Sequence, residues 1–235
     1  MTAHRIHIPA SVTDRVIRRR GKAHPYEDLE PSRTALVVID MQNGFMREDV
    51  AHAYCANAAS VVPAINRLAG SLRTAGGKVF WIQNIHTDAC LTEWSAMYDY
   101  VTPESRERRI AAMTAGSEGH AFWPEIDIRP EDMIVEKRRY SAFIEGSSDL
   151  TARLRWGGFD TVLIAGTVTN TCCESSARDA TMLNFKTIMV SDGCAANSDE
   201  EHKASLIAFY LIFGDVMTTE EIEERLAARP ARPEG

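Results

Sequence analysis

Apolar residues gather along the chain in short, nearly uninterrupted runs, and between these runs they recur at helical spacing. The runs lie at residues 35–39, 78–83, 132–136, 161–165, 186–190 and 215–217. Runs of this length are typical of strands that are covered on both faces. The helical spacing predicts helices over residues 57–75, 104–113 and 149–156, and others that begin near Cys172, Ser198 and Thr218.

Strands that alternate with helices in this way predict a parallel sheet with helices on both faces. We therefore expect an α/β protein with a three-layer α/β/α arrangement around a mainly parallel, six-stranded, Rossmann-like sheet. The length of 235 residues and the hydrophobic share of 45% suit one large core. The expected division is an N-terminal arm over residues 1–33, one domain over residues 34–228 and a disordered tail over residues 229–235.

The arm is polar and basic, with a short helix predicted from Ser11 to Arg20. Two interpretations of it stay open. The arm wraps the domain or a neighbouring subunit, or it is a disordered tail, because it has no apolar core of its own.

Composition limits which classes of binding partner and which cellular compartment are expected. The formal net charge of −7 argues against nucleic acid or an anionic membrane as the main partner. No apolar run is long enough to span a bilayer, and the first residues lack the apolar core of a signal peptide. The five cysteines show neither a disulfide framework nor a CxxC pair. We expect a cytoplasmic protein whose thiols stay reduced.

Three chemically capable residues follow predicted strands: Asp40, Lys137 and Cys172. In parallel sheets ligands bind at the carboxyl ends of the strands. A thiol at a helix N-terminus is stabilised as a thiolate by free N–H groups and by the helix dipole. Asp40 would then take the thiol proton, and Lys137 would hold both anions. Each residue has a structural alternative, namely a capping carboxylate, a solvated lysine or a buried thiol, but their coincidence at strand ends favours catalysis.

Other candidates carry weaker signals. Asp49, His52 and His86 could form a metal site, but their spacing matches no standard motif, so we predict neither a metal nor another cofactor. Cys173 is expected to pack in the interior. Residues 91–130 mix aromatic and charged side chains without clear periodicity, and we expect this excursion to form the wall of a binding site.

Residues 35–43, 136–143 and 166–180 together resemble the isochorismatase-like superfamily of cysteine hydrolases. The resemblance implies the fold of these hydrolases and a catalytic triad of Asp40, Lys137 and Cys172. It also implies a cis peptide before Val168, with an oxyanion hole formed by the N–H groups of Val168 and Cys172. The implied reaction is attack of the thiolate on an amide carbonyl, loss of ammonia or an amine, and hydrolysis of a thioester.

Within this superfamily the segments around Gln83-Asn84 and Lys137–Phe143 are similar to the ureidoacrylate and N-carbamoyl amidohydrolases. This similarity implies that Asn84 and Tyr140 hydrogen-bond the substrate. Nicotinamidases have an Asp-x-His metal pair, which the spacing of Asp49 and His52 does not match.

We therefore expect a metal-free cysteine amidohydrolase that cleaves a C–N bond of a small ureido, carbamoyl or carboxamide compound. The alternatives are a nicotinamidase-type, metal-assisted amidase and a non-catalytic binding protein of the same fold. A carboxylate on the substrate would meet Arg138, Arg139 or an arginine of the 106–109 cluster. The resemblance further implies a homo-oligomer, either a dimer or a tetramer, with no nucleic acid or membrane partner.

Overall fold

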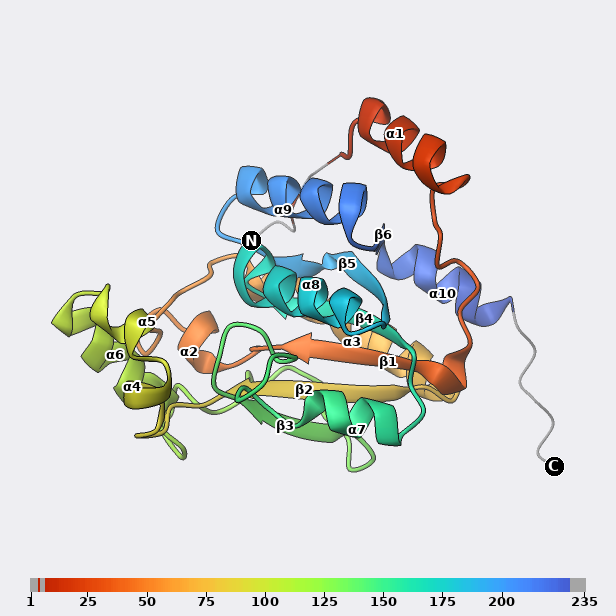
Figure 1. Cartoon of the computed structure of the whole chain (residues 1–235). Helices are drawn as coiled ribbons and strands as arrows, with labels where there is room; N and C mark the ends of the chain where they lie inside the picture. Colours follow the sequence, from red (N-terminus) through yellow and green to blue (C-terminus); the bar gives the residue numbers. More distant parts are fainter. Residues whose placement is uncertain (1–3, 5–6, 229–235) are drawn as a thin grey trace.

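The computed structural model describes residue 4 and residues 7–228, in which six strands form one sheet. Figure 1 shows how the helices and this sheet are arranged. Every neighbouring pair is parallel, and the order is β3-β2-β1-β4-β5-β6. The strands are β1 Thr34–Ile39, β2 Lys78–Asn84, β3 Met133–Lys137, β4 Thr161–Thr167, β5 Lys186–Ala195 and β6 Asp215–Met217. The predicted six-stranded parallel sheet is confirmed, and the apolar runs form its strands because both faces are covered.

Helices cover both faces of the sheet (Figure 1). One face is packed by α3 Val62–Thr74 and α10 Thr219–Ala227. The other is packed by α7 Leu150–Trp156, α8 Glu174–Met182 and α9 Asp199–Ile212. Side chains of β1 alternate between the two cores: Leu36 and Val38 enter the first, and Val37 enters the second.

The helix starts follow local sequence signals. Thr218 and Glu221 form a reciprocal capping box at the start of α10, and Ser198 accepts a hydrogen bond from the Glu201 N–H at the start of α9. The helix predicted over residues 57–75 is divided into a 3₁₀ turn, η2 Ala58–Val61, and α3. Pro63 stands in the first turn of α3, where its missing N–H removes no helical hydrogen bond.

The N-terminal helix α1 Ala10–Arg20 packs against α9 of the same chain, with Val16 buried between them. The Arg20 guanidinium donates to the Gly214 carbonyl over 2.6 Å, and the Tyr210 hydroxyl donates to the Ala23 carbonyl over 2.8 Å. Of the two interpretations, the structure shows an arm that wraps its own domain; the tail over 229–235 lies outside the described residues. None of the described helices is long and apolar enough to cross a membrane.

The excursion between β2 and β3 contains short helices. These are α4 Cys90–Glu93, α5 Ser95–Asp99 and α6 Pro103–Met113. The helix predicted over 104–113 is thus confirmed as α6, and Thr102 caps it by accepting from the Ser105 N–H. The remaining short elements are η1 Pro31–Arg33, α2 Asn43–Met46 and η3 Thr169–Cys173.

Candidate active site

The ends of three strands bring Asp40, Lys137 and Cys172 together. Asp40 follows β1, Lys137 is the last residue of β3, and Cys172 lies in η3 just beyond β4. The Lys137 Nζ is 2.8 Å from the Asp40 Oδ2, and neither side chain is exposed to solvent. Lys137 also donates to the Arg139 carbonyl over 3.0 Å. The buried Cys172 thiol lies near the same Asp40 carboxylate, and the two groups act on each other electrostatically. The predicted cluster is therefore one buried constellation.

Burial dominates the protonation of this cluster. It raises the pKa of Asp40, and the charge of Lys137 only partly opposes this. For Lys137 burial acts to lower the pKa, but the neighbouring Asp40 and Cys172 outweigh it, and the pKa is raised. Burial raises the pKa of Cys172 to about 12, and Asp40 adds to the rise while Lys137 opposes it. Lys137 therefore keeps its proton in its 2.8 Å contact with Asp40, beside a protonated thiol.

This result corrects the expected thiolate. The sequence placed Cys172 at a helix N-terminus, where a thiol pKa falls. In the structure Cys172 lies in the π-helical turn η3 ahead of α8, which begins at Glu174. The desolvation of a fully buried thiol outweighs the helix dipole, so the pKa rises instead. At rest the thiol of Cys172 thus keeps its proton.

The backbone around the cluster has three unusual features. The Thr167–Val168 peptide is cis, as the resemblance implies, and Asp40 has a positive φ of 55°. Gly166 has a φ of +113°, and a Cβ on it would lie 2.1 Å from the Ile39 carbonyl oxygen. Glycine is thus required where β4 pairs with the end of β1, immediately before the loops that carry Asp40 and Cys172.

Side chains of α9 form hydrogen bonds to the loop that carries the Cys172 thiol. The Thr169 hydroxyl lies 2.8 Å from the Nδ1 of the buried His202, and the Ser205 hydroxyl donates to the Thr169 carbonyl over 3.4 Å. The His4 ring of the N-terminal arm stacks on His202, with 4.2 Å between ring centroids. Cys173 points into the core, where its Sγ approaches the Ala165 carbonyl at 3.8 Å. The two adjacent cysteines therefore face different surroundings.

The predicted substrate-binding residues lie beside the cluster. Asn84 ends β2 directly opposite Lys137 in the strand register. Its backbone is fixed by the Gln42 side chain, which accepts from the Asn84 N–H over 2.7 Å and donates to the Asn84 carbonyl over 3.0 Å. The Tyr140 hydroxyl lies 3.3 Å from that of Tyr100. Burial, together with Tyr100, raises the pKa of Tyr140 to about 12, so its hydroxyl keeps its proton.

The model of the isochorismatase domain matches residues 34–221. The chain belongs to the isochorismatase family. It is 31% identical over 203 residues to the uncharacterized isochorismatase family protein YwoC of Bacillus subtilis, covering 85% of this chain and 97% of that protein. It is 27% identical over 233 residues to the ureidoacrylate amidohydrolase RutB of Stutzerimonas stutzeri, covering 94% of this chain and 93% of that protein.

Solved structures agree with the family assignment. The cysteine hydrolase from Pseudomonas syringae pv. phaseolicola 1448A superposes with a TM-score of 0.75 at 29% identity, covering 86% of this chain and 95% of that chain. Family membership and the amidohydrolase relatives support the predicted class of enzyme, a hydrolase acting on C–N bonds outside peptides. The predicted resemblance and the isochorismatase-like fold are confirmed.

The structure also places residues in this isochorismatase-family site that the sequence did not single out. Arg109 of α6 is buried and acts electrostatically on Asp40, Lys137 and Cys172. The sequence offered it only as one of several arginines. Gln42 is the second residue after Asp40 and lies within the first segment that resembles the family. Its position in that segment could have marked it as a site residue, although a glutamine side chain by itself suggests no catalytic role.

The three residues considered for a metal do not form a site. The Asp49 carboxylate is exposed and pairs with Arg47 over 3.0 Å. His52 is half-buried, and desolvation of its ring lowers its pKa to about 3. His86 Nδ1 lies 2.8 Å from the Tyr98 hydroxyl. Within residue 4 and residues 7–228, no three His, Cys, Asp or Glu side chains are arranged to hold a metal ion.

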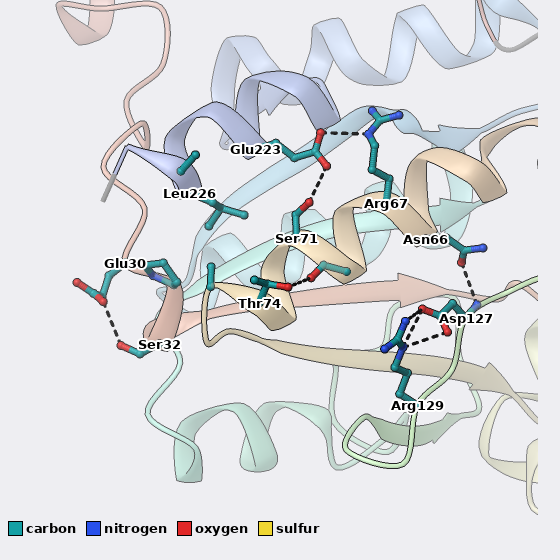
Figure 2. A pocket seen from close by; sticks show the side chains of 14 residues that line it. Glu30, Ser32, Asn66, Arg67, Ser71, Thr74, Asp127, Arg129, Glu223 and Leu226 are labelled. Carbon is teal, nitrogen blue, oxygen red and sulfur yellow. Dashed lines mark hydrogen bonds and ion pairs between the residues drawn. The ribbon is translucent and has the colours of Figure 1, made fainter. Parts of the chain in front are cut away.

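A cavity of about 810 Å³ lies away from this chemistry (Figure 2). It is lined by the segment before β1 and by α3 and α10, at the edge of the sheet where the strands begin. Its charged residues neutralise one another: Arg67 Nε is 3.1 Å from Glu223, and Arg129 pairs with Asp127 at 3.0 Å. A smaller groove of about 390 Å³ includes Trp94 and Tyr140 and so borders the candidate site.

Proposed function

We propose that this protein is a cysteine-dependent amidohydrolase that cleaves the C–N bond of a small ureido, carbamoyl or carboxamide compound through a thioester. The observation that carries the proposal is the buried ion pair of Asp40 and Lys137 beside the Cys172 thiol. The similarity to proteins named ureidoacrylate amidohydrolase supports the choice of substrate class.

A buried ion pair contributes little to the stability of a fold. Desolvating two charges costs several kcal/mol per ion, and a well-packed apolar pair serves the fold as well or better. Asp40 and Lys137 are nevertheless fully buried and lie next to a protonated thiol. Such a group of coupled, perturbed side chains is typical of a catalytic centre and argues against a binding protein without turnover.

The reaction follows from these positions. Asp40 takes the proton of Cys172, and Lys137 stabilises the resulting thiolate by its charge. The sulfur attacks the carbonyl carbon, and the N–H groups of Val168 and Cys172 stabilise the oxyanion. Collapse of the tetrahedral intermediate breaks the C–N bond, and the leaving nitrogen receives the proton from Asp40. The products are ammonia or an amine and an acyl thioester.

Hydrolysis of the thioester uses the same residues. Asp40, ionised again, takes a proton from a water molecule, and the hydroxide attacks the thioester carbonyl. The C–S bond breaks, the thiolate recovers a proton from Asp40, and the acid product leaves. Because Asp40 accepts and returns a proton in both halves, its raised pKa brings it nearer to the pH at which it must do both.

The test is ammonia release from ureidoacrylate, N-carbamoyl amino acids, biuret and nicotinamide. We expect turnover of at least one ureido or carbamoyl compound by the wild type. Cys172→Ser should lower kcat by several orders of magnitude, as when other covalent nucleophiles are removed. Cys173→Ala is the matched control, because it removes the neighbouring thiol from the core and not from the site. Full activity in Cys172→Ser would refute the mechanism.

A further inference from the structure

Arg109 differs from the other arginines of its helix. On α6, Arg108 is exposed and forms a helical ion pair with Glu104 at 3.4 Å, whereas Arg109 is buried. Arg109 points toward the candidate site, where its charge acts on Asp40 and Cys172. The excursion between β2 and β3 thus contributes one cation to the catalytic centre.

The guanidinium of Arg109 is held by weak, neutral partners. Its Nη2 donates a long hydrogen bond of 3.4 Å to the Asn84 Oδ1, and its Nε–H has no hydrogen-bond partner among the described residues. The Trp94 ring lies 5.8 Å from its central carbon, which orients the planar group by a cation–π contact. Within residues 7–228, no carboxylate forms an ion pair with it.

The two alternative arginines are engaged elsewhere. Arg138 and Arg139 approach the Glu93 carboxylate at 4.0 and 3.8 Å, and Arg139 also donates to the Glu93 carbonyl over 3.1 Å. Of the arginines considered for a substrate carboxylate, Arg109 is the buried one without an acidic partner in the described structure.

The charges of the buried centre do not cancel. Asp40 and Lys137 neutralise each other, and the Cys172 thiol is uncharged at rest. Arg109 therefore leaves one positive charge in excess. An unpaired buried charge is strongly unfavourable, so this arrangement is complementary to an anionic ligand. The planar fork of a guanidinium matches a carboxylate, to which it donates two parallel hydrogen bonds.

We propose that Arg109 binds a carboxylate of the substrate and makes the enzyme selective for ureido or carbamoyl acids over neutral ureas and amides. The inference rests on the proposed function, because it takes the scissile group to lie at Cys172. In this arrangement Trp94 and Asn84 orient the guanidinium of Arg109. The substrate reaches from the Cys172 thiol, at its scissile carbonyl, to Arg109 of α6, at its carboxylate.

The experiment compares two compounds that differ only at the far end. The acid 3-ureidopropanoate carries a carboxylate where n-propylurea carries a methyl group. We expect the wild type to prefer the acid. Arg109→Gln should lower kcat/KM for the acid by about 10- to 100-fold, chiefly through KM, as expected for a lost hydrogen bond to a charged group. The loss on n-propylurea should be much smaller. Arg108→Gln, on the same helix, should match the wild type.

Binding separates this inference from the proposed function. Calorimetry on Cys172→Ala measures the affinity for both compounds without turnover, and Arg109→Gln in that background should abolish the preference for the acid. If the wild type cleaves neither compound but this preference appears, the proposed function fails and the assignment of Arg109 stands. Equal affinity for both compounds, no binding of either, or equal losses on both in Arg109→Gln would overturn the assignment.

Discussion

The ammonium of Lys137 and the carboxylate of Asp40 are each other's ionic partners in a place that water does not reach. Removing one of them leaves the other as an uncompensated buried charge, which is far more harmful to a fold than removing both. The two groups that we propose to be catalytic therefore also affect the stability of the fold, whereas the sequence alone suggested only a chemical role for them.

Lys137→Met tests this coupling. We expect it to abolish turnover and to lower the free energy of unfolding by about 3–5 kcal/mol at pH 8, since Asp40 then stays buried without a counter-ion. Burial raises the pKa of Asp40, and the loss of Lys137 removes the main opposing charge. The folded variant thus retains a proton that the unfolded chain has released, so its stability falls as the pH rises above the ordinary range of an aspartate.

Urea denaturation at pH 5 and pH 8 measures the effect, with the smaller loss expected at pH 5. The double variant Asp40→Asn, Lys137→Met is the control. It removes both charges and should recover much of the stability while remaining inactive. If Lys137→Met were as stable as the wild type at pH 8, Asp40 would not be held as a buried anion.

Among the secondary-structure elements, the site depends most on the close pairing of β4 with β1. Gly166 faces the backbone of Ile39, so any side chain at this position meets rigid atoms and not a flexible group. Asp40 and the cis peptide before Val168 lie directly beyond this paired position. The contact between two strands thus sets the positions of Asp40 and of the loop that carries Cys172.

Gly166→Ala is expected to destabilise the protein by more than 2 kcal/mol, roughly the scale of an overpacked core position with an added backbone penalty, and to reduce kcat sharply. The matched control is Gly70→Ala on α3, where a Cβ meets nothing within 4 Å. That change should be neutral or stabilising by about 0.5–1 kcal/mol, because alanine is favoured over glycine inside a helix. Thermal unfolding and ammonia release of both variants give the comparison.

The elements and the meeting of Asp40, Lys137 and Cys172 could be predicted from the sequence because their signals are local. An apolar run marks a buried strand, and a polar residue at its end marks the ligand edge of the sheet, which sufficed for Asp40, Lys137 and Cys172. Arg109 could not be isolated in this way, because it stands in a run with Arg106 and Arg108 and only tertiary packing buries one of them. The pKa of Cys172 likewise depends on enclosure by distant segments.

For the molecule as a whole, self-association stays a prediction. We expect a homo-oligomer, either a dimer or a tetramer, at micromolar concentration. A cytoplasmic location is a separate expectation. Size-exclusion chromatography with light scattering decides the first point, since a dimer and a tetramer of a 26.1 kDa chain are well separated in mass. A monomer at the concentrations used for the activity assay would contradict it.

The order of the strands also governs when the site can exist. Lys137 ends β3 and Cys172 follows β4, and these strands lie on opposite sides of the pair formed by β2 and β1. Asp40, Lys137 and Cys172 are separated by long stretches of chain, so they meet only after several parallel pairings between distant segments have formed. Contacts of such long range form slowly during folding, because loop closure comes before any compensating contact. Helical content therefore returns early in refolding, whereas enzymatic competence is among the last properties to be acquired.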